Sequence, residues 1–473
     1  MCVFKKVLVA NRGEIATRII RSCKEMNLKT AAIYSEADST ALHVKKADEA
    51  YLVGPGPVAG YLNIHRLVDL AKEIGADAIH PGYGFLSENP RLPELCEKSG
   101  ITFVGPSSYA ISSMGDKSAA RKIMTEAGIP VVPGTGNIRS DDEALAFAEK
   151  AGFPIMVKAT SGGGGRGLRV CRNEKELIDN LKSAKSEAES AFGNAEVFLE
   201  KYIENPHHIE FQIMADSQGN IIHLGERDCS IQRRHQKLVE IAPSLLLSEK
   251  LRKEMGDVAV RAARAVNYTN AGTIEFILDK EMNYYFIEMN TRLQVEHTVT
   301  EAITGISLVR AQLEIAAGMP LAVKQEDVNI RGYAIECRIN AEDPKNNFMP
   351  YTGKVTAYYS PGGIGVRIDG CVYKDYVIPP YYDSMVAKLI VSGMTWEETV
   401  DRMRRSLDEF VVRGIKTTIP FHYNIMTDEE FRKGDFDTGF IDRRPDLLEY
   451  SEKRDRTDLV IAISAAIAAY EGF

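Results

Sequence analysis

The stretch Ile287-Glu288-Met289-Asn290-Thr291-Arg292-Leu293-Gln294-Val295-Glu296-His297 restricts the fold more than any other part of the sequence. Apolar side chains at most odd positions alternate with polar side chains at even positions. This period of two predicts an extended segment with one apolar and one polar face. The polar face carries acids, amides and a guanidinium, whereas a merely solvated strand more often carries Thr, Lys or Ser. Because functional sites concentrate such groups, we predict a site here rather than an exposed strand face.

The residues just upstream predict a β-hairpin over residues 273–289 with a short turn. Pairing across this turn places Leu278 opposite Tyr285 and Glu275 opposite Glu288. Two carboxylates at about 4 Å repel each other by roughly 4 kcal/mol at an effective dielectric constant of about 20. We therefore expect either that one of them is protonated or that a cation lies between them.

Three oxygen-bearing side chains on this face form a candidate metal site: Glu275, Glu288 and Asn290. Ligand sets made only of oxygen favour magnesium or manganese, held together with substrate phosphates. The sequence shows no accompanying group of thiols or histidines that would suit zinc. The hairpin therefore predicts a Mg²⁺ or Mn²⁺ site.

Bulk composition narrows the class of protein. A chain of 473 residues suggests about three domains, and 44% hydrophobic and 26% charged residues are typical of a globular protein. The 66 acidic residues outnumber the 58 basic ones, which argues against a general nucleic-acid binder. Seven scattered cysteines without a C-x-x-C pair indicate a reducing cytoplasm. We see no signal peptide, and the longest apolar run, 459–470, is too short to span a membrane.

The N-terminal region alternates strand-like and helix-like patterns. Strand patterns occur at 6–10, 30–34, 49–53, 77–80 and 101–104, and helical patterns at 15–26 and 64–71. Such alternation predicts a doubly wound parallel sheet. A dinucleotide site is the obvious alternative, but its fingerprint fails, because only Gly13 is present where three glycines are required.

A glycine-rich loop at 160–167 follows a strand pattern that ends near Lys158. The residues after the glycines predict another strand, and a helix begins only at Asn173, where Glu176 completes a capping box. A Walker A loop or a Rossmann turn must open directly into a helix, so both are disfavoured. A glycine hairpin whose backbone N–H groups fold over phosphates fits better. A floppy surface loop, the other interpretation, does not explain the basic residues Lys158 and Arg166 on either side.

The stretch 226–237 contains a local basic cluster: Arg227, Arg233, Arg234, His235 and Lys237. In an acidic protein such a cluster suits a small anion or a ligand phosphate, and a solvated loop remains the alternative.

Taken together, these features resemble the ATP-grasp enzymes, and in detail the biotin carboxylase family. The matching motifs are residues 9–16, 80–89 and 114–117, Lys158 with glycines 162–165, and residues 200–204, 233–237 and 288–296. They occur in the family's order over roughly residues 3–445. The resemblance implies an α/β fold in four parts: an N-terminal doubly wound parallel-sheet (pre-ATP-grasp) domain at 1–114, an ATP-grasp domain at 115–317 with a mobile lid at about 131–203, a C-terminal α+β/β domain at 318–446, and an extension at 447–473.

The resemblance also implies a ligase activity. ATP and bicarbonate would form carboxyphosphate, whose CO₂ passes to the ureido nitrogen of biotin, with Mg²⁺ or Mn²⁺ as cofactor. The catalytic residues implied are Glu296 as the base, Arg292, Lys237, and Arg338 at the biotin enolate. Bicarbonate would be held by Lys237, Arg292, Gln294, Val295 and Glu296. ATP would be bound by Lys117, Lys158, Gly163, Gly164, Gly165, Glu200, Lys201, Tyr202, Ile203, His208, His235, Glu275 and Glu288.

Two features of the sequence bear on partners. The resemblance leaves the final carboxyl acceptor open between acetyl-CoA and pyruvate or another 2-oxo acid. The family often has His-Pro after the catalytic glutamate, whereas this chain has His297-Thr298, a variant associated more with pyruvate-type carboxylases. The sequence contains no Met-Lys-Met biotinylation site, so we expect the biotin carboxyl carrier protein and the carboxyltransferase on other chains. A homodimer is expected from the resemblance, and the tail at 459–473 is a candidate docking segment for a partner.

Two alternatives compete with this interpretation. One is another ATP-grasp ligase, such as a relative of carbamoyl-phosphate synthetase or of D-Ala–D-Ala ligase. The other is a non-catalytic ATP-binding regulator, which would have no need for a bicarbonate base such as Glu296.

Overall fold

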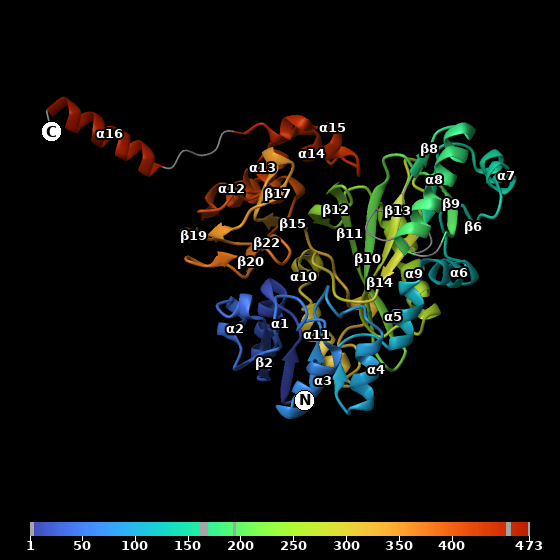
Figure 1. Cartoon of the computed structure of the whole chain (residues 1–473), viewed down its shortest axis with the longest axis horizontal. Coiled ribbons are helices and arrows are strands. Elements are labelled where there is room, and N and C mark those ends of the chain that lie inside the picture. The colour runs from blue at the N-terminus through green and yellow to red at the C-terminus, as the bar shows by residue number, and fades with distance from the viewer. Residues whose placement is uncertain (1–3, 160–168, 193–194, 451–455, 472–473) are drawn as a thin grey trace.

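The computed structural model describes residues 4–159, 169–192, 195–450 and 456–471. In these ranges the chain forms three sheets of four or more strands. Figure 1 shows the N-terminal sheet and its helices in blue, a separate teal and green unit, and a large green-to-orange sheet between them. Parallel strands in the first sheet and antiparallel strands in the other two confirm the predicted α/β fold class.

The first sheet is parallel, with strand order β3-β2-β1-β4-β5. Its strands are β1 (Lys6–Val9), β2 (Lys29–Tyr34), β3 (Glu49–Leu52), β4 (Ala78–His80) and β5 (Thr102–Phe103), and its principal helices are α1 (Gly13–Glu25), α3 (Ile64–Glu73) and α4 (Arg91–Lys98). Alternate side chains of β1 enter different cores: Val7 and Val9 pack with Ile19, whereas Leu8 packs with Leu67. Burial on both faces explains why β1 is apolar from Val7 to Val9.

A four-stranded antiparallel sheet, in the order β6-β9-β7-β8, forms the separate teal and green unit. It contains β6 (Gly134–Asn137), β7 (Ile155–Ala159), β8 (Arg169–Cys171), β9 (Val197–Lys201), α7 (Asp141–Ala151) and α8 (Glu174–Phe192). Within the described ranges it has its own apolar core, in which Val157 and Leu199 meet Leu181. The predicted strand before the glycine loop and the strand after it are therefore confirmed as β7 and β8, while the loop itself lies outside the described residues.

The largest sheet has eight antiparallel strands in the order β14-β13-β10-β11-β12-β15-β22-β20. They are β10 (His207–Ala215), β11 (Ile221–Arg233), β12 (Gln236–Ala242), β13 (Asn270–Leu278), β14 (Tyr284–Asn290), β15 (Tyr333–Asn340), β20 (Val366–Gly370) and β22 (Met385–Gly393). The pairing of β12 with β15 joins the central and C-terminal segments into one sheet. We therefore propose, without fixing their bounds, that the two segments act together as one site-bearing unit.

Helices cover and connect this sheet. They are α5 (Ser108–Gly115), α6 (Lys117–Glu126), α9 (Glu249–Ala265), α10 (His297–Thr304), α11 (Leu308–Ala316), α12 (Trp396–Glu409), α13 (Ile419–Thr427), α14 (Glu429–Lys433) and α15 (Phe440–Arg443). A final helix, α16 (Arg456–Glu471), stands away from the rest in Figure 1. Among the described helices, none combines the length and the hydropathy that a bilayer span requires.

The β13–β14 hairpin corrects one part of the predicted register. Leu278 pairs with Tyr284, not with Tyr285, and the register shifts by one residue between Phe276 and Glu275. This bulge, a single extra residue on β14, restores the predicted pairing of Glu275 with Glu288. The prediction was wrong near the turn because a period of two cannot reveal an inserted residue.

The stretch after Asn290 is the second correction. β14 ends at Asn290, and the chain then turns until α10 begins at His297, so the predicted extended segment stops halfway. The polar side chains Gln294 and Glu296 are only 3% and 2% exposed, in agreement with the prediction that this face is not an exposed strand face. The alternation of apolar and polar residues predicted one buried face and one polar face. In the structure both kinds of side chain are buried in this segment, because polar contacts as well as apolar ones surround it.

Candidate active site

A row of charged side chains crosses one face of the central sheet. In the ladder, Glu288 lies opposite Glu275, Glu275 opposite Glu210, and Glu210 opposite Arg227. Directly opposed residues share a face of the sheet, so these four strands present one continuous charged strip. The sequence predicted only the Glu275–Glu288 pair of this row, and the strand pairing of the structure adds Glu210 and Arg227 to it.

The Lys237 ammonium group, on β12, is the centre of the site. Its Nζ lies 2.5 Å from Glu210 Oε2, 3.1 Å from Glu275 Oε1 and 2.8 Å from Glu296 Oε1. Burial by itself would lower the pKa of Lys237, but the three carboxylates together hold that pKa well above its ordinary value. The lysine is therefore a fixed positive charge around which the acids are arranged.

Glu296 lies between two cations. One of its oxygens accepts a hydrogen bond from Lys237 at 2.8 Å, and the other accepts one from Arg338 Nη2 at 3.1 Å. Burial alone would raise the pKa of Glu296, but Lys237, Arg338 and Arg227 hold the pKa well below its ordinary range. The carboxylate is therefore ionised, and an anion brought beside it would raise its pKa and make it a stronger base.

The Arg338 guanidinium is oriented by a second carboxylate. Its Nε donates to Glu240 Oε1 at 2.6 Å, while Nη2 reaches Glu296. Glu240 lies directly opposite Glu336 in the β12–β15 ladder. Within the described part of the chain, each of these acids keeps one buried oxygen without a hydrogen-bond partner. Burial raises the pKa of Glu240 to about 7 and that of Glu336 well above its ordinary value, against the opposing effect of nearby cations.

Glu240→Gln tests this buried pair through the pH dependence of stability. The pKa of Glu240 is raised on folding from 4.5 to about 7. Its contribution to stability is therefore complete below the lower value and is lost as the pH rises through the higher one. Glutamine cannot ionise, so the variant does not lose this contribution as the pH rises. The unfolding free energy of the variant minus that of the wild type should therefore be roughly 2–3 kcal/mol larger at about pH 8 than at about pH 5. Urea unfolding of both proteins at both pH values measures this quantity. The same value at both pH values would contradict the raised pKa of Glu240.

Arg227 corrects the predicted basic cluster. This side chain is fully buried, and its guanidinium donates to five side chains: Glu210, Gln212, Thr273, Gln294 and Thr300. Arg233 instead reaches Asn347, and Arg234 and His235 form the β11–β12 turn with positive φ values of 49° and 65°. The cluster therefore does not form as one group, because strand alternation and the turn separate its members.

The loop after β14 brings Arg292 and Gln294 to the site. Arg292 Nε donates to Glu88 Oε2 at 2.9 Å, and its Nη2 donates to Asn290 Oδ1 at 3.0 Å. Gln294 donates to Glu275 at 2.6 Å and accepts from Arg227 at 2.8 Å. The charged row therefore fixes Gln294, whereas Glu88 and Asn290 fix Arg292. Glu88, which sequence analysis placed only inside a motif, is an additional contact.

The backbone beside Glu296 is held by a fully buried lysine from β22. Lys388 Nζ donates to the Val295 carbonyl oxygen at 2.7 Å and lies 3.3 Å from Glu14 Oε1 on α1. Because the Val295 carbonyl belongs to the peptide bond that leads into Glu296, this contact restricts the position of that carboxylate. Sequence analysis missed Lys388 and placed Glu14 only inside a motif. The signal for Lys388 was a charged residue inside an otherwise apolar segment.

Thr298, at the start of α10, donates its hydroxyl hydrogen to Glu336 Oε2. A proline at this position could not supply that hydrogen bond. The His297-Thr298 sequence therefore adds a contact to the buried acid pair on the neighbouring strand.

The predicted metal ligands come together. Glu275 lies opposite Glu288, and Asn290 Nδ2 donates to Glu275 Oε1 at 2.7 Å. Burial and the charge of Glu275 raise the pKa of Glu288, while Lys117 opposes that shift. A divalent cation would relieve this repulsion, and the oxygen donors fit magnesium or manganese.

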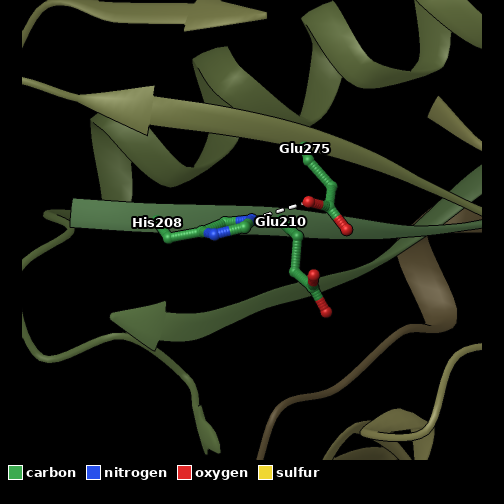
Figure 2. Close-up of side chains that lie close together, drawn as sticks. All are labelled: His208, Glu210 and Glu275. Carbon is green, nitrogen blue, oxygen red and sulfur yellow. Dashed lines mark hydrogen bonds and ion pairs between the residues drawn. The ribbon is translucent and has the colours of Figure 1, made fainter. Parts of the chain in front are cut away.

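His208 adds a ring nitrogen beside these acids. Its Nε2 lies 2.7 Å from Glu275 Oε2, and the two side chains come from adjacent strands (Figure 2). Ligand atoms of His208, Glu210 and Glu275 all lie within 4.8 Å of one another. His208 thus holds one oxygen of Glu275 while Lys237 holds the other.

The predicted nucleotide residues lie around the separate four-stranded sheet and the edge of the charged row. Glu200 on β9 forms ion pairs with Lys158 on β7 and, at 2.8 Å, with Arg121 on α6. Lys201 Nζ donates to the carbonyl oxygens of Gly152 and Phe153 at 3.1 and 3.0 Å. Tyr202 donates its backbone N–H to Pro154.

The remaining nucleotide residues are more dispersed. Ile203 is half-buried just after β9, Lys117 is exposed at the start of α6, and His235 is exposed in the β11–β12 turn. Gly163, Gly164 and Gly165 lie outside the described residues. The structure therefore brings Lys158 and Glu200 together and leaves Lys117 and His235 at the edges of the site.

Comparisons with known proteins agree with this geometry. Residues 3–111 and 336–443 match the family models of the biotin carboxylase N-terminal and C-terminal domains, and residues 116–324 match the carbamoyl-phosphate synthase L chain ATP-binding domain. The chain is 56% identical to the 2-oxoglutarate carboxylase small subunit of Hydrogenobacter thermophilus, over 99% of this chain and 100% of that protein. It is also 56% identical to biotin carboxylase 1 of Bacillus subtilis, over 93% of this chain and 98% of that protein.

Solved structures agree as well. The biotin carboxylase domain dimer of the Hydrogenobacter thermophilus 2-oxoglutarate carboxylase, in complex with MgADP, ADP and bicarbonate, superposes with a TM-score of 0.90. That structure is 56% identical in sequence and covers 95% of this chain and 99% of its own chain. With family models across most of its length and relatives of this identity, the chain belongs to the biotin carboxylase family.

Proposed function

We propose that this protein is the biotin carboxylase subunit of a 2-oxo acid carboxylase and that it carboxylates biotin on a separate carrier protein, using ATP and bicarbonate. The observation that carries the proposal is the ionised Glu296 carboxylate held between Lys237 and Arg338. This arrangement suits an anionic acceptor that must lose a proton as it attacks a phosphate.

In the first step, a bicarbonate oxygen attacks the γ-phosphorus of ATP, the bond to ADP breaks, and the bicarbonate proton passes to Glu296. Bicarbonate bound near Glu296 adds a negative charge, which raises the pKa of that carboxylate towards the value a base requires. Lys237 and Arg292 would hold the anion, together with Gln294 and the Val295 backbone.

In the second step, carboxyphosphate would break at its C–O bond into CO₂ and phosphate, the phosphate would take the proton of the biotin ureido nitrogen, and that nitrogen would bond to the CO₂. Negative charge develops on the ureido oxygen, and Arg338 is the cation that would stabilise it. Glu240 keeps the guanidinium in place through the hydrogen bond at its Nε, 2.6 Å long. Glu240 is thus a positioning residue rather than a catalytic one.

Nucleotide and metal would occupy the other end of the charged row. Lys117, Lys158, His208 and His235 would contact the phosphates, with the adenine near Glu200 and residues 201–203. Glu275, Glu288 and Asn290 would hold Mg²⁺, which when bound offsets the charge of the transferred phosphoryl group.

Glu288→Gln tests the metal assignment. Glu288 lies outside the hydrogen-bond network of Lys237, so its replacement should preserve the fold while removing one oxygen charge. The Mg²⁺ concentration for half-maximal activity should rise at least about tenfold, because loss of a residue that only orients a metal ligand already weakens metal binding by about tenfold or more. Titration of activity with Mg²⁺ measures this, and Glu254→Gln on the exposed face of α9 is the control. An unchanged Mg²⁺ requirement would exclude Glu288 as a ligand.

Several observations support the cellular setting. Relatives that match 99% of this chain include a subunit of the pyruvate carboxylase of Methanothermobacter thermautotrophicus and the small subunit of the Hydrogenobacter 2-oxoglutarate carboxylase. The Hydrogenobacter structure is a dimer, which supports a homodimer here. In the described ranges the cysteines are buried thiols rather than disulfides, which supports a reducing, cytoplasmic setting.

The decisive experiment is ADP release by the purified chain in the presence of MgATP. We expect it to require bicarbonate and to increase when free biotin is added. Activity that ignores biotin but responds to an amine or amino acid would indicate another ATP-grasp ligase. Nucleotide binding without any turnover would indicate a regulator.

A further inference from the structure

Helix α16 exposes an apolar surface that nothing in the fold explains. Five of its 16 residues are large apolar side chains with high exposure: Val460 59%, Ile461 60%, Ile463 50%, Ile467 56% and Tyr470 92%. Figure 1 shows the helix standing away from the rest of the molecule. Single exposed apolar residues are ordinary, but a group of them on one short helix marks an interaction surface.

Four of these residues form one stripe. Val460, Ile463, Ile467 and Tyr470 follow the spacing i, i+3, i+7, i+10, which places them along one side of a helix. The opposite side carries mainly alanines, including Ala465 and Ala469. This is the pattern of a helix that lies in a groove and inserts a row of anchors. A helix of this length is marginal in water alone, so docking would also stabilise it.

A comparison of chain lengths indicates which kind of partner would bind α16. The family models end at residue 443, before α16. The Hydrogenobacter and Methanothermobacter relatives, both from 2-oxo acid carboxylases, align over 99% of this chain. Biotin carboxylase 1 of Bacillus subtilis aligns over 93% of this chain and 98% of its own length, so its remaining 2% is too short for a 16-residue helix. Among these three relatives, the two that align over the extra segment are therefore the two subunits of 2-oxo acid carboxylases.

We propose that α16 docks its Val460–Ile463–Ile467–Tyr470 stripe into an apolar, helix-lined groove of the second, biotin-bearing subunit of the carboxylase. The inference rests on the proposed function for the identity of that subunit. A membrane surface fits less well, because interfacial helices carry Lys and Arg along their polar face, and α16 has one Arg against Asp458 and Glu471.

The test uses the full-length chain and the biotin-bearing subunit from the same organism, co-expressed and identified by streptavidin blotting. Ile463→Gln with Ile467→Gln removes two anchors, and Ala465→Gln with Ala469→Gln is the matched control on the opposite side. We expect the first pair to weaken assembly about 100-fold, since each buried anchor is worth about tenfold or more. The control pair should assemble like the wild type, and size-exclusion chromatography with light scattering measures both.

Bicarbonate-dependent ADP release with free biotin separates this proposal from the proposed function. That activity should be equal in all three proteins, because α16 lies outside the site; its absence from the wild type would overturn the proposed function instead. Normal assembly of the Ile463/Ile467 variant would overturn the docking proposal. The docking proposal would also be overturned if the only effect of the Ile463/Ile467 variant were a loss of self-association or a loss of co-sedimentation with anionic vesicles.

Discussion

Replacing Glu296 by glutamine is expected to lower bicarbonate-dependent ADP formation by roughly 10²–10⁴-fold, the usual contribution of a general base. The variant keeps the shape of the side chain but cannot accept the bicarbonate proton. Binding of MgATP should persist, because the nucleotide residues lie on β7, β9 and the far end of the charged row. Initial rates and a nucleotide-binding titration measure the two effects separately.

The control for this variant is Glu73→Gln, which alters an exposed ion pair with Arg66. It should leave both quantities unchanged. Turnover like that of the wild type in Glu296→Gln would remove Glu296 as the base, whereas loss of nucleotide binding would show that the carboxylate mainly maintains the structure.

Arg227→Met is expected to lower the free energy of unfolding by about 3–5 kcal/mol, the range for breaking a buried ion pair. The guanidinium is fully buried, and its removal leaves Glu210, Gln294 and two threonines short of a donor. Because Gln294 is among the residues it holds, the KM for bicarbonate should rise as well. Urea unfolding measures the first effect and initial rates the second.

Arg66→Met is the matched control, since its partner Glu73 is 57% exposed and surface pairs contribute about 0–1 kcal/mol. An Arg227→Met protein as stable as Arg66→Met would contradict the structural role assigned to the buried arginine.

The sequence predicted local features well and long-range ones poorly. The pairing of Glu275 with Glu288 is within a hairpin, so strand periodicity was enough to find it. The bulge on β14 was not visible, because Tyr284, Tyr285, Phe286 and Ile287 form an apolar and aromatic run with no alternation that an extra residue could interrupt. The contact of Glu240 with Glu336 joins strands almost a hundred residues apart, and only the sheet order brings them together.

Charged residues inside apolar segments were the signal that sequence analysis did not use. Glu240, Glu336 and Lys388 each interrupt an otherwise buried strand, and each is fully buried in the structure. Such residues need a partner, because burial of an unpaired charge costs several kcal/mol. Their partners could not be identified from the sequence, because each of them comes from a different part of the chain. Arg227 shows the reverse error, since its basic neighbours in sequence suggested a single cluster that binds a small anion or a ligand phosphate, whereas the structure buries Arg227 among other partners.

The contact of Lys388 with Val295 and Glu14 has a consequence for the order in which the protein matures during synthesis. Glu14 leaves the ribosome early, yet the ammonium group that compensates it is added more than 370 residues later. Until β22 is made, the N-terminal unit holds a carboxylate without its cation, and the peptide leading into Glu296 lacks its anchor. A nascent chain that ends before Lys388 therefore lacks the contact that restricts the Glu296 carboxylate, and the site is complete only when the last strands of the sheet have been made.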